Sequence, residues 1–259
     1  MRSAVLFFIT ATTACSGYVK PDTAASRARL EEETHLTFFT PNQAQPNDAV
    51  VRVVTRRAFC SGALVSDAIV ITAEHCVTDL GEEGWSAMPA GYVRVELGKD
   101  ALPWGRVGAR HVLTCDGWQG DASRDVAAIV LERRVPRDVA RLRMKLDDAN
   151  TGSAFVAQGF GTGMSYRSMP ITGSPIWSSQ RATRNGTLVW NGADDFALEM
   201  SSSHGDSGGP IISKDTNEVV GVAAAGREHE GTPMTVAARI APCASMLAQA
   251  ATYERTITD

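Results

Sequence analysis

SSSHGDSGGP, residues 201–210, is the stretch of this chain that says most about its fold. It holds four serines and three glycines, with His204 and Asp206 between them. Stretches rich in glycine and serine are most often turns or flexible linkers. A second interpretation is a rigid turn that presents one serine, because glycine adopts backbone conformations that are closed to other residues. The surrounding sequence decides between the two.

The overall composition indicates a globular protein. The chain has 259 residues, of which 44% are hydrophobic and 21% charged, and this length suits one large domain or two smaller ones. The net charge of −4 leaves no strongly basic surface, so we expect no nucleic-acid partner. No apolar run reaches the roughly 18 residues that a membrane-spanning helix needs.

The N-terminus is predicted to be an export signal over residues 1–15. A positive residue is followed by a short apolar run and then by small residues that lead to Cys15. TTAC, residues 12–15, resembles the lipobox of bacterial lipoproteins, which implies a lipid on Cys15 and a membrane tether. Thr12 departs from that pattern, which has leucine there. The alternative is a plain secretory signal cut near Ala14.

Either signal exports the chain, as a lipoprotein of the outer membrane or periplasm or as a secreted protein. Residues 16–46 are polar and are predicted to be a tether or propeptide. In an oxidising compartment we expect disulfides, and setting Cys15 aside leaves four cysteines, which allow three pairings. With no CxxC pair and no close His/Cys cluster, we expect no metal site and no cofactor.

From residue 49 onward the chain consists of short runs rich in valine and isoleucine, separated by glycines. Such runs predict many short strands, as in a β-barrel or sandwich. A charged stretch, residues 133–150, divides them into two groups, as an interdomain connection would. An alanine-rich segment after Pro242 predicts one terminal helix. The runs are 49–54, 62–72, 92–97, 106–114 and 125–132, then 153–161, 186–191, 195–200, 209–213, 218–226 and 234–240.

Three short patterns follow one another along the chain. They are CSG (60–62) with ITAEHC (71–76), then DVAAIVL (125–131), then GDSGGP (205–210). Together, over roughly residues 46–255, they resemble the trypsin/chymotrypsin family of serine proteases. The resemblance implies an all-β fold, with two six-stranded antiparallel β-barrels packed together and a C-terminal helix. It also implies one protease domain over residues 47–259, a polypeptide substrate and a monomer.

The same resemblance assigns roles to the residues of these patterns. His75 is the expected general base, Asp125 the group that orients it, and Ser207 the nucleophile. The backbone N–H groups of Gly205 and Ser207 are expected to form the oxyanion hole. Asp121 is the rival to Asp125, which we prefer because apolar residues follow it at once.

The family also suggests how the four remaining cysteines pair. It joins the cysteine after the histidine to one at the position of Cys60, which gives Cys60–Cys76. The usual cysteine four residues before the nucleophile is absent, because Ser203 stands there. Cys115 and Cys243 are therefore predicted as the second pair.

GDSGG also fits G-x-S-x-G, the nucleophile turn of α/β-hydrolases. That fold would need an acid and a histidine after the serine, with Asp215 and His229 as the candidates. The residues after Ser207 are predicted as strands and one helix, so we reject this alternative.

Substrate preference is expected to depend on Ser201, His204 and Gly226. Ser201 lies six residues before the nucleophile, where family members that cut after Arg or Lys have aspartate, so we expect cleavage after small or medium neutral residues. Gly226 would leave the pocket mouth open, and Met234 or Thr235 would form the opposite wall.

Two departures from the family concern activation and the base. Many members need a new N-terminus, Ile-Val-Gly-Gly, whose ammonium pairs with the aspartate at the position of Asp206. Residues 35–38 contain no such start, so Asp206 needs another cation or an unrecognised N-terminus. Glu74 stands where a small residue is usual, and its carboxylate either raises the pKa of His75 or points to solvent. A catalytically silent, protease-like binding protein and an esterase are the competing functions.

Overall fold

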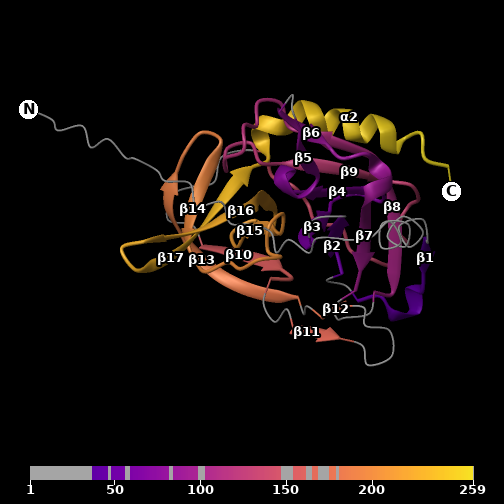
Figure 1. Cartoon of the computed structure of the whole chain (residues 1–259), viewed down its shortest axis with the longest axis horizontal. Coiled ribbons are helices and arrows are strands. Elements are labelled where there is room, and N and C mark those ends of the chain that lie inside the picture. The colour runs from indigo at the N-terminus through magenta and orange to yellow at the C-terminus, as the bar shows by residue number, and fades with distance from the viewer. Residues whose placement is uncertain are drawn as a thin grey trace, which may run out of the picture.

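Two closed β-barrels followed by one helix form the part of the chain that the structure describes (Figure 1). The computed structural model describes residues 37–45, 48–55, 59–81, 84–98, 103–146, 154–161, 165–168, 175–178 and 181–258. The predicted signal, Cys15 and most of the predicted tether lie outside the described residues.

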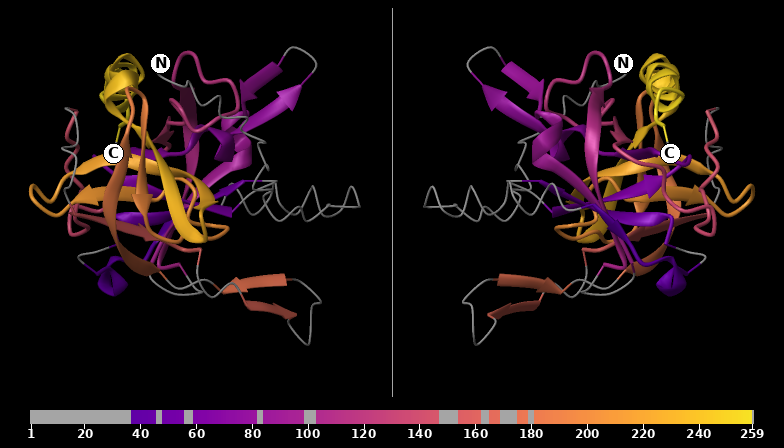
Figure 2. Two further views of the ribbon diagram at one scale, coloured as in Figure 1. Left: turned by 90° about the vertical axis from the view of Figure 1, so that its left-hand side faces the viewer. Right: turned by 90° about the vertical axis from the view of Figure 1, so that its right-hand side faces the viewer.

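The first barrel has six antiparallel strands in the order β8-β7-β2-β3-β4-β9, and β8–β9 pairing closes it. A short strand, β1, pairs with β8 at the edge. A hairpin, β5–β6, projects from the barrel (Figure 2). The strands are β1 (Phe38–Phe39), β2 (Val50–Thr55), β3 (Phe59–Leu64), β4 (Ile69–Thr72), β5 (Thr78–Gly81), β6 (Gly84–Ala87), β7 (Val93–Leu97), β8 (Gly105–Thr114) and β9 (Ala127–Leu131).

The second barrel is also six-stranded and antiparallel, in the closed order β10-β13-β14-β17-β16-β15. Its strands are β10 (Ala154–Gly159), β13 (Ala182–Asn191), β14 (Asp195–Glu199), β15 (Pro210–Ser213), β16 (Val219–His229) and β17 (Thr232–Arg239). Two further strands, β11 (Ser165–Ser168) and β12 (Pro175–Ser178), pair only with each other. The expected architecture of two six-stranded barrels with a C-terminal helix is confirmed.

Each barrel is filled by the apolar residues that the sequence places along its strands. Side chains alternate between the two faces of a strand, so one face of each strand contributes to the barrel core. Phe155, Phe196 and Ile211 fill the second barrel and are fully buried. β9 is buried on both faces, AAIVL having no exposed residue, because a helix covers its outer face.

That helix is α2 (Ala244–Glu254), preceded by the 3-10 turn η4 (Ala241–Cys243). It crosses from the end of the second barrel back over the first (Figures 1 and 2), where it packs on β9, β4 and β8. Met246, Leu247 and Ala250 form its buried face. The helix therefore packs the C-terminal end of the described chain against the first barrel. No helix among the described residues is long and apolar enough to cross a membrane.

Three short 3-10 turns lie in or before the first barrel: η1 (Pro41–Gln43), η2 (Glu74–Cys76) and η3 (Ala90–Tyr92). The segment between the barrels, described up to residue 146, contacts the second barrel through a parallel bridge between Met144 and Val219. Val219 also donates its N–H to the carbonyl of Arg143.

Candidate active site

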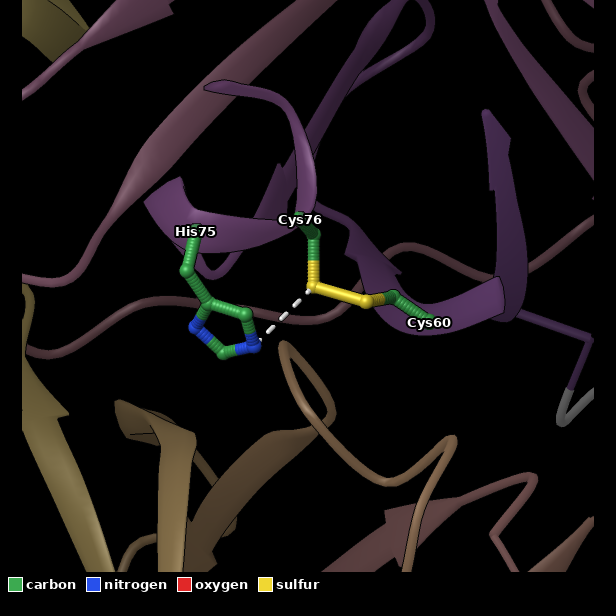
Figure 3. A group of neighbouring side chains, drawn as sticks. All are labelled: Cys60, His75 and Cys76. Atoms are coloured by element: carbon green, nitrogen blue, oxygen red, sulfur yellow. Dashed lines mark hydrogen bonds between the residues drawn. A yellow bond between two sulfur atoms is a disulfide. The ribbon is translucent and has the colours of Figure 1, made fainter. Parts of the chain in front are cut away.

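The candidate base, His75, lies in the turn η2 directly after β4. A disulfide between Cys60 and Cys76 joins this turn to β3, beside the imidazole (Figure 3). The His75 side chain is 33% exposed, so the ring can meet a substrate while its backbone is braced. Its Nε2 lies 3.6 Å from the Sγ of Cys76.

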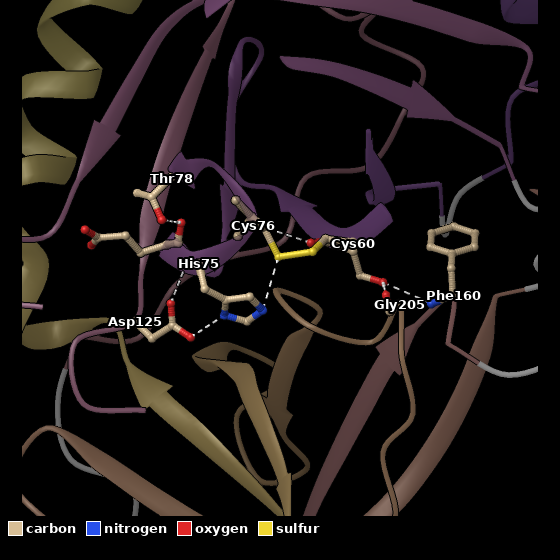
Figure 4. Close-up of a disulfide and its surroundings, with 10 residues drawn as sticks. Cys60, His75, Cys76, Thr78, Asp125, Phe160 and Gly205 are labelled. Atoms are coloured by element: carbon tan, nitrogen blue, oxygen red, sulfur yellow. Dashed lines mark hydrogen bonds and ion pairs between the residues drawn. A yellow bond between two sulfur atoms is a disulfide. The ribbon is translucent and has the colours of Figure 1, made fainter. Parts of the chain in front are cut away.

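Asp125 lies two residues before β9 and holds the His75 ring from the other side (Figure 4). Its Oδ2 lies 2.7 Å from Nδ1 of the ring, and its Oδ1 accepts the backbone N–H of His75 at 2.9 Å. A carboxylate in this position holds the proton on Nδ1 and leaves Nε2 as the basic nitrogen. Burial lowers the pKa of His75, but the charge of Asp125 and its hydrogen bond outweigh burial, so the net pKa is raised.

The rival aspartate lies in a different environment. Asp121 is exposed, and its Oδ1 accepts the N–H of Ser123 at 3.0 Å. Its backbone carbonyl accepts the indole N–H of Trp118. These contacts are those of a loop-capping aspartate and leave Asp125 as the residue that contacts the imidazole.

Ser207 lies in the loop between β14 and β15, on the second barrel. Its carbonyl accepts the N–H of Ser61 on β3 at 2.8 Å. The next residue, Gly208, has φ 78°, and a Cβ there would lie 2.1 Å from Oγ1 of Thr72 and 2.7 Å from the N of Ala73. Only glycine allows so close an approach to the strand end that leads into the turn of His75.

The structure thus brings the loop of Ser207 against the segment that carries His75. Within the described residues, no hydrogen bond joins the Oγ of Ser207 to the Nε2 of His75. In enzymes without bound substrate such contacts are often long, and they tighten when substrate binds. The contact between Asp125 and His75 is therefore present, whereas the described residues show no hydrogen bond between Ser207 and His75.

Two backbone donors in the Ser207 loop make no hydrogen bond to the described part of the chain. The N–H of Asp206 donates to Ser203, that of Gly208 to Ala223 and that of Gly209 to Asp206. The N–H groups of Gly205 and Ser207 have no such acceptor. Because buried N–H groups are nearly always paired in proteins, two unpaired donors in one turn indicate a site for an anionic oxygen. Gly205 reaches this geometry with φ 96°, in the left-handed region.

A serine that the sequence did not single out holds this loop to the first barrel. Ser61, on β3, is fully buried. Its hydroxyl donates to the carbonyl of Gly205 at 2.7 Å and accepts the N–H of Phe160 at 2.9 Å (Figure 4). With its backbone bond to Ser207, it fixes both ends of the short segment 205–207.

Asp206 has the other cation that its position requires. Nη1 of Arg184, on β13, lies 2.8 Å from Oδ2 of Asp206. Nothing in the sequence around residue 184 marks it for this role, because the contact joins strand β13 to the loop between β14 and β15 and arises only in the folded barrel.

Glu74 points inward, which neither alternative of the sequence analysis anticipated. It is buried, and its Oε2 accepts the N–H of Cys115 at 3.0 Å. Burial raises its pKa to about 8; the Cys115 N–H opposes this, and the charges of Asp125 and Asp116 add to it. At neutral pH Glu74 is therefore protonated and adds no negative charge beside His75.

Both predicted cysteine pairs are disulfides in the structure. Cys115–Cys243 joins the end of β8 to the start of α2. The N–H of Cys115 is shared between Oε2 of Glu74 and the carbonyl of Val126 at 3.1 Å. The Cys115–Cys243 disulfide therefore lies where the segment that carries His75 meets the segment that carries Asp125.

The residues predicted for substrate preference lie near the same loop. Ser201 and His204 are exposed, and Gly226 is exposed on β16. A Cβ on Gly226 would lie 2.9 Å from Oγ of Ser202, so Ser202, which the sequence analysis did not name, faces the glycine. The two candidates for the opposite wall of the pocket, Met234 and Thr235, differ in their burial.

Thr235 is fully buried, and its hydroxyl donates to the carbonyl of Met200 at 2.9 Å. Met234 is only partly buried and lies opposite Glu199 in the pairing of β14 with β17. Of these two, Met234 is therefore the residue with side-chain surface left for a ligand.

One group of potential metal ligands occurs among the described residues, namely Cys60, His75 and Cys76. Its two sulfurs form the disulfide, and a disulfide sulfur is not the thiolate that binds metals. These residues therefore do not fit a metal while the disulfide is intact.

Comparison with known proteins agrees with this geometry. A trypsin from Sarcophaga bullata is 26% identical over 200 residues, which cover 71% of this chain and 74% of that protein. A solved structure of a Glu endopeptidase in complex with MPD has a TM-score of 0.63 at 16% identity, covering 85% of this chain and 96% of that one. An inactivated protease paralogue of the scabies mite has a TM-score of 0.61 at 16% identity, covering 80% and 93%. The sequence model of the family described as Trypsin matches residues 39–247, and the chain therefore belongs to the trypsin family.

Proposed function

We propose that this protein is a serine endopeptidase with His75, Asp125 and Ser207 as its catalytic residues. The observation that supports this most is the pair of hydrogen bonds that Asp125 accepts from the ring and the backbone N–H of His75, which fix both the ring and its tautomer. The unpaired N–H groups of Gly205 and Ser207 supply the second requirement of acyl transfer, donors for the oxyanion.

The reaction proceeds in two halves. His75 Nε2 takes the proton of Ser207 as its Oγ bonds to the carbonyl carbon of the scissile peptide, and the oxyanion binds the N–H groups of Gly205 and Ser207. The C–N bond breaks as His75 returns the proton to the leaving amine. Water then gives a proton to His75 as its oxygen bonds to the acyl carbon. The bond from that carbon to Ser207 Oγ breaks as His75 returns the proton to Oγ, and the carboxylic acid product leaves and ionises in water.

We propose a preference for small or medium neutral residues on the acyl side of the cleaved bond. Ser201 and Ser202 supply hydroxyls and no charge, and Gly226 leaves the space before Ser202 without a side chain. Met234 provides an apolar neighbour on the adjacent strand β17. A library of peptides that vary at one position, incubated with the purified protein, measures this preference.

The competing function is a catalytically silent binding protein. It is favoured by the missing Ser207–His75 hydrogen bond, and the scabies-mite paralogue is an inactivated protein of the same fold. Treatment with a fluorophosphonate distinguishes the two, since it reacts with an activated serine and not with an ordinary one. We expect a single labelled site in the parent and none in Ser207→Ala. A folded parent that stays unlabelled would refute the peptidase function.

Parallel assays with peptide and ester substrates test the esterase alternative. We expect both to be cleaved, because the acyl-enzyme chemistry is the same for the two. Cleavage of esters alone would replace the endopeptidase proposal with the esterase.

The two disulfides agree with an exported protein, because they persist in oxidising compartments. We further propose that residues 16–46 tether a monomeric catalytic domain to a lipid on Cys15. Mass spectrometry of the mature N-terminus tests the lipid, with Cys15→Ser as the unlipidated control. Size-exclusion chromatography of the domain tests the monomer.

A further inference from the structure

Asp206 stands in the chain between Gly205 and Ser207, the two proposed oxyanion donors, and its carboxylate lies in a site shaped to fit it. Its side chain is 6% exposed. Oδ1 accepts the N–H of Gly161, and Oδ2 accepts that of Ser203, both at 2.9 Å. A Cβ on Gly159 would lie 2.5 Å from this carboxylate, and a Cβ on Gly161 2.4 Å. Gly159 and Gly161 therefore form a cradle that only a glycine pair allows.

A carboxylate this far from water needs a cation, because an unpaired buried charge is strongly unfavourable. Arg184 provides it with Nη1 at 2.8 Å from Oδ2, and its own side chain is only 14% exposed. Nη2 of the same guanidinium lies 3.5 Å from the hydroxyl of Ser203, which itself lies 3.2 Å from Oδ2. In this setting the charge pair is poorly screened by solvent.

The cation and the cradle belong to the same barrel. Arg184 is on β13, and its backbone partner is Ala157 on β10. β10 ends at Gly159 and leads directly into the cradle. Arg184 and the cradle, which together hold Asp206, are therefore both parts of the second barrel.

The chain near the expected activation site is occupied elsewhere. Phe38 and Phe39 form β1 and pair with β8 of the first barrel. Thr40 continues this contact, its N–H donating to the carbonyl of Trp104 at 2.8 Å. Figure 1 shows β1 at the edge of the first barrel that faces away from the second.

We propose that Arg184 is a positioning residue that holds Asp206, and through it Gly205 and Ser207, in the active arrangement without any N-terminal ammonium. This inference rests on the proposed peptidase function. It means that the catalytic domain is assembled as soon as it folds, so that removing an upstream segment is not what orders the oxyanion site.

The two cations differ in how they respond to pH. A guanidinium stays charged up to about pH 12, whereas an α-ammonium loses its proton near pH 8. Among the described residues, the other titratable or charged groups on elements that pack around the cradle are His204 in the same loop and Arg52 of β2, which lies over the Phe160 ring. Arg52 is paired with Glu96.

The experiment compares the full chain with Arg184→Gln, Arg184→Lys and the control Arg143→Gln. Arg143 is an 82% exposed arginine that pairs with Glu218, so it matches the substitution without touching the site. For each protein we measure the rate of fluorophosphonate labelling of Ser207 and kcat/KM for a peptide from about pH 7 to 10.5. The series is repeated in a Glu74→Gln background, which removes the carboxyl group that ionises near pH 8. The parent is also tested after acetylation of its α-amine.

We expect Arg184→Gln to lower the labelling rate and kcat by at least about 100-fold, the range seen when an oxyanion donor is lost. Arg184→Lys should retain activity within about tenfold but lose it around pH 10, where an ammonium on lysine deprotonates. The parent should keep its activity to the highest pH, with the α-amine acetylated or not. If Arg184→Gln does not fold, the comparison of Arg184→Lys with the parent still decides the test. A purely structural role for Arg184 would not give Arg184→Lys a loss of activity around pH 10 that the parent lacks.

Two results would overturn the inference while leaving the peptidase function intact. One is a labelled parent with Arg184→Gln labelled equally fast. The other is a loss of parent activity centred near pH 8 that acetylation reproduces at neutral pH. A parent that is not labelled at all fails both the peptidase function and the role of Arg184.

Discussion

Asp125 holds His75 through two hydrogen bonds at once, one to the imidazole Nδ1 and one to the backbone N–H of the same residue. Asp125→Asn keeps the shape of this side chain but permits the wrong tautomer, with the proton on Nε2. We expect kcat to fall by about 10³–10⁴-fold with little change in KM. The exposed neighbour provides the control, and Asp121→Asn should stay within about twofold of the parent. Equal losses in both variants would mean that Asp125 is not the orienting group.

The same contact predicts the acid limb of the pH profile. The charge and hydrogen bond of Asp125 raise the pKa of His75 above its ordinary value of 6.5, against the effect of burial. His75 must be neutral to act as a base, so kcat/KM should be half-maximal above pH 6.5 in the parent. In Asp125→Asn the midpoint of the residual activity should move to lower pH. A midpoint that is the same in both proteins would contradict this cause.

Glu74 predicts a fall in stability as the pH rises. Its pKa is about 8 in the folded protein and 4.5 ordinarily, so between these values the folded state holds a proton that the unfolded chain has lost. The free energy of unfolding therefore decreases through this window, by up to a few kcal/mol, since each pKa unit corresponds to about 1.4 kcal/mol. Glu74→Gln keeps the acceptor for the Cys115 N–H and should remove this slope.

Denaturant titrations at pH 5, 6.5 and 8 would measure this decrease in the free energy of unfolding as the difference between the parent and Glu74→Gln. A substitution at an exposed glutamate, Glu228→Gln, is the control. A variant that keeps the parent's slope would show that Glu74 is ionised throughout.

Removing the Cys115–Cys243 disulfide should weaken both the fold and the site. It closes a loop of 128 residues in sequence separation, for which a disulfide is worth about 2–5 kcal/mol. In a domain of this size we expect the double variant Cys115→Ala/Cys243→Ala to melt about 5–15 °C lower. Because Cys115 also contacts the carboxyl of Glu74, the slope predicted for Glu74 should shrink in the same variant. Calorimetry at two pH values tests both, and an unchanged melting temperature would rule out the structural role.

Gly226 predicts how specificity can be changed. A Cβ at this position would approach Oγ of Ser202, so Gly226→Val should fill the space before that serine. We expect cleavage after medium-sized residues to drop by at least about tenfold relative to cleavage after alanine, the size of a one-methylene discrimination. The complementary change is Ser201→Asp, six residues before Ser207, which should raise cleavage after Arg or Lys. A peptide library read out with both variants decides whether Gly226, Ser201 or neither lines the site.

The two barrels were predictable because their strands are short runs rich in valine and isoleucine, divided by glycines. Three motifs in one order along the chain also gave the resemblance to the family that has this fold. The same motifs pointed to His75 and Asp125, which the structure brings into contact, and to Ser207, whose catalytic role stays a proposal. Hairpin β5–β6 was not predicted, since five of its eight strand residues are exposed and it has no apolar alternation.

The remaining features depend on contacts that no local pattern reveals. Arg184 lies in an unremarkable stretch of β13, and its role arises only where that strand passes the Ser207 loop. The inward direction of Glu74 depends on the rotation of a three-residue turn, which the composition of that turn does not determine. The sequence also did not show that Ser202 faces Gly226. In an irregular loop, neighbouring side chains point in different directions, and the sequence does not determine which of them points inward.

The bond between Cys115 and Cys243 also changes the covalent form of the molecule. Together with the backbone between these residues it makes a closed ring, which contains β9 and all six strands of the second barrel. One peptide-bond cut anywhere between Cys115 and Cys243 opens the ring but leaves a single covalent molecule, held further by the packing of α2 on β9. The protein can thus be nicked once in this region while Ser207 stays covalently joined to the segment that carries His75.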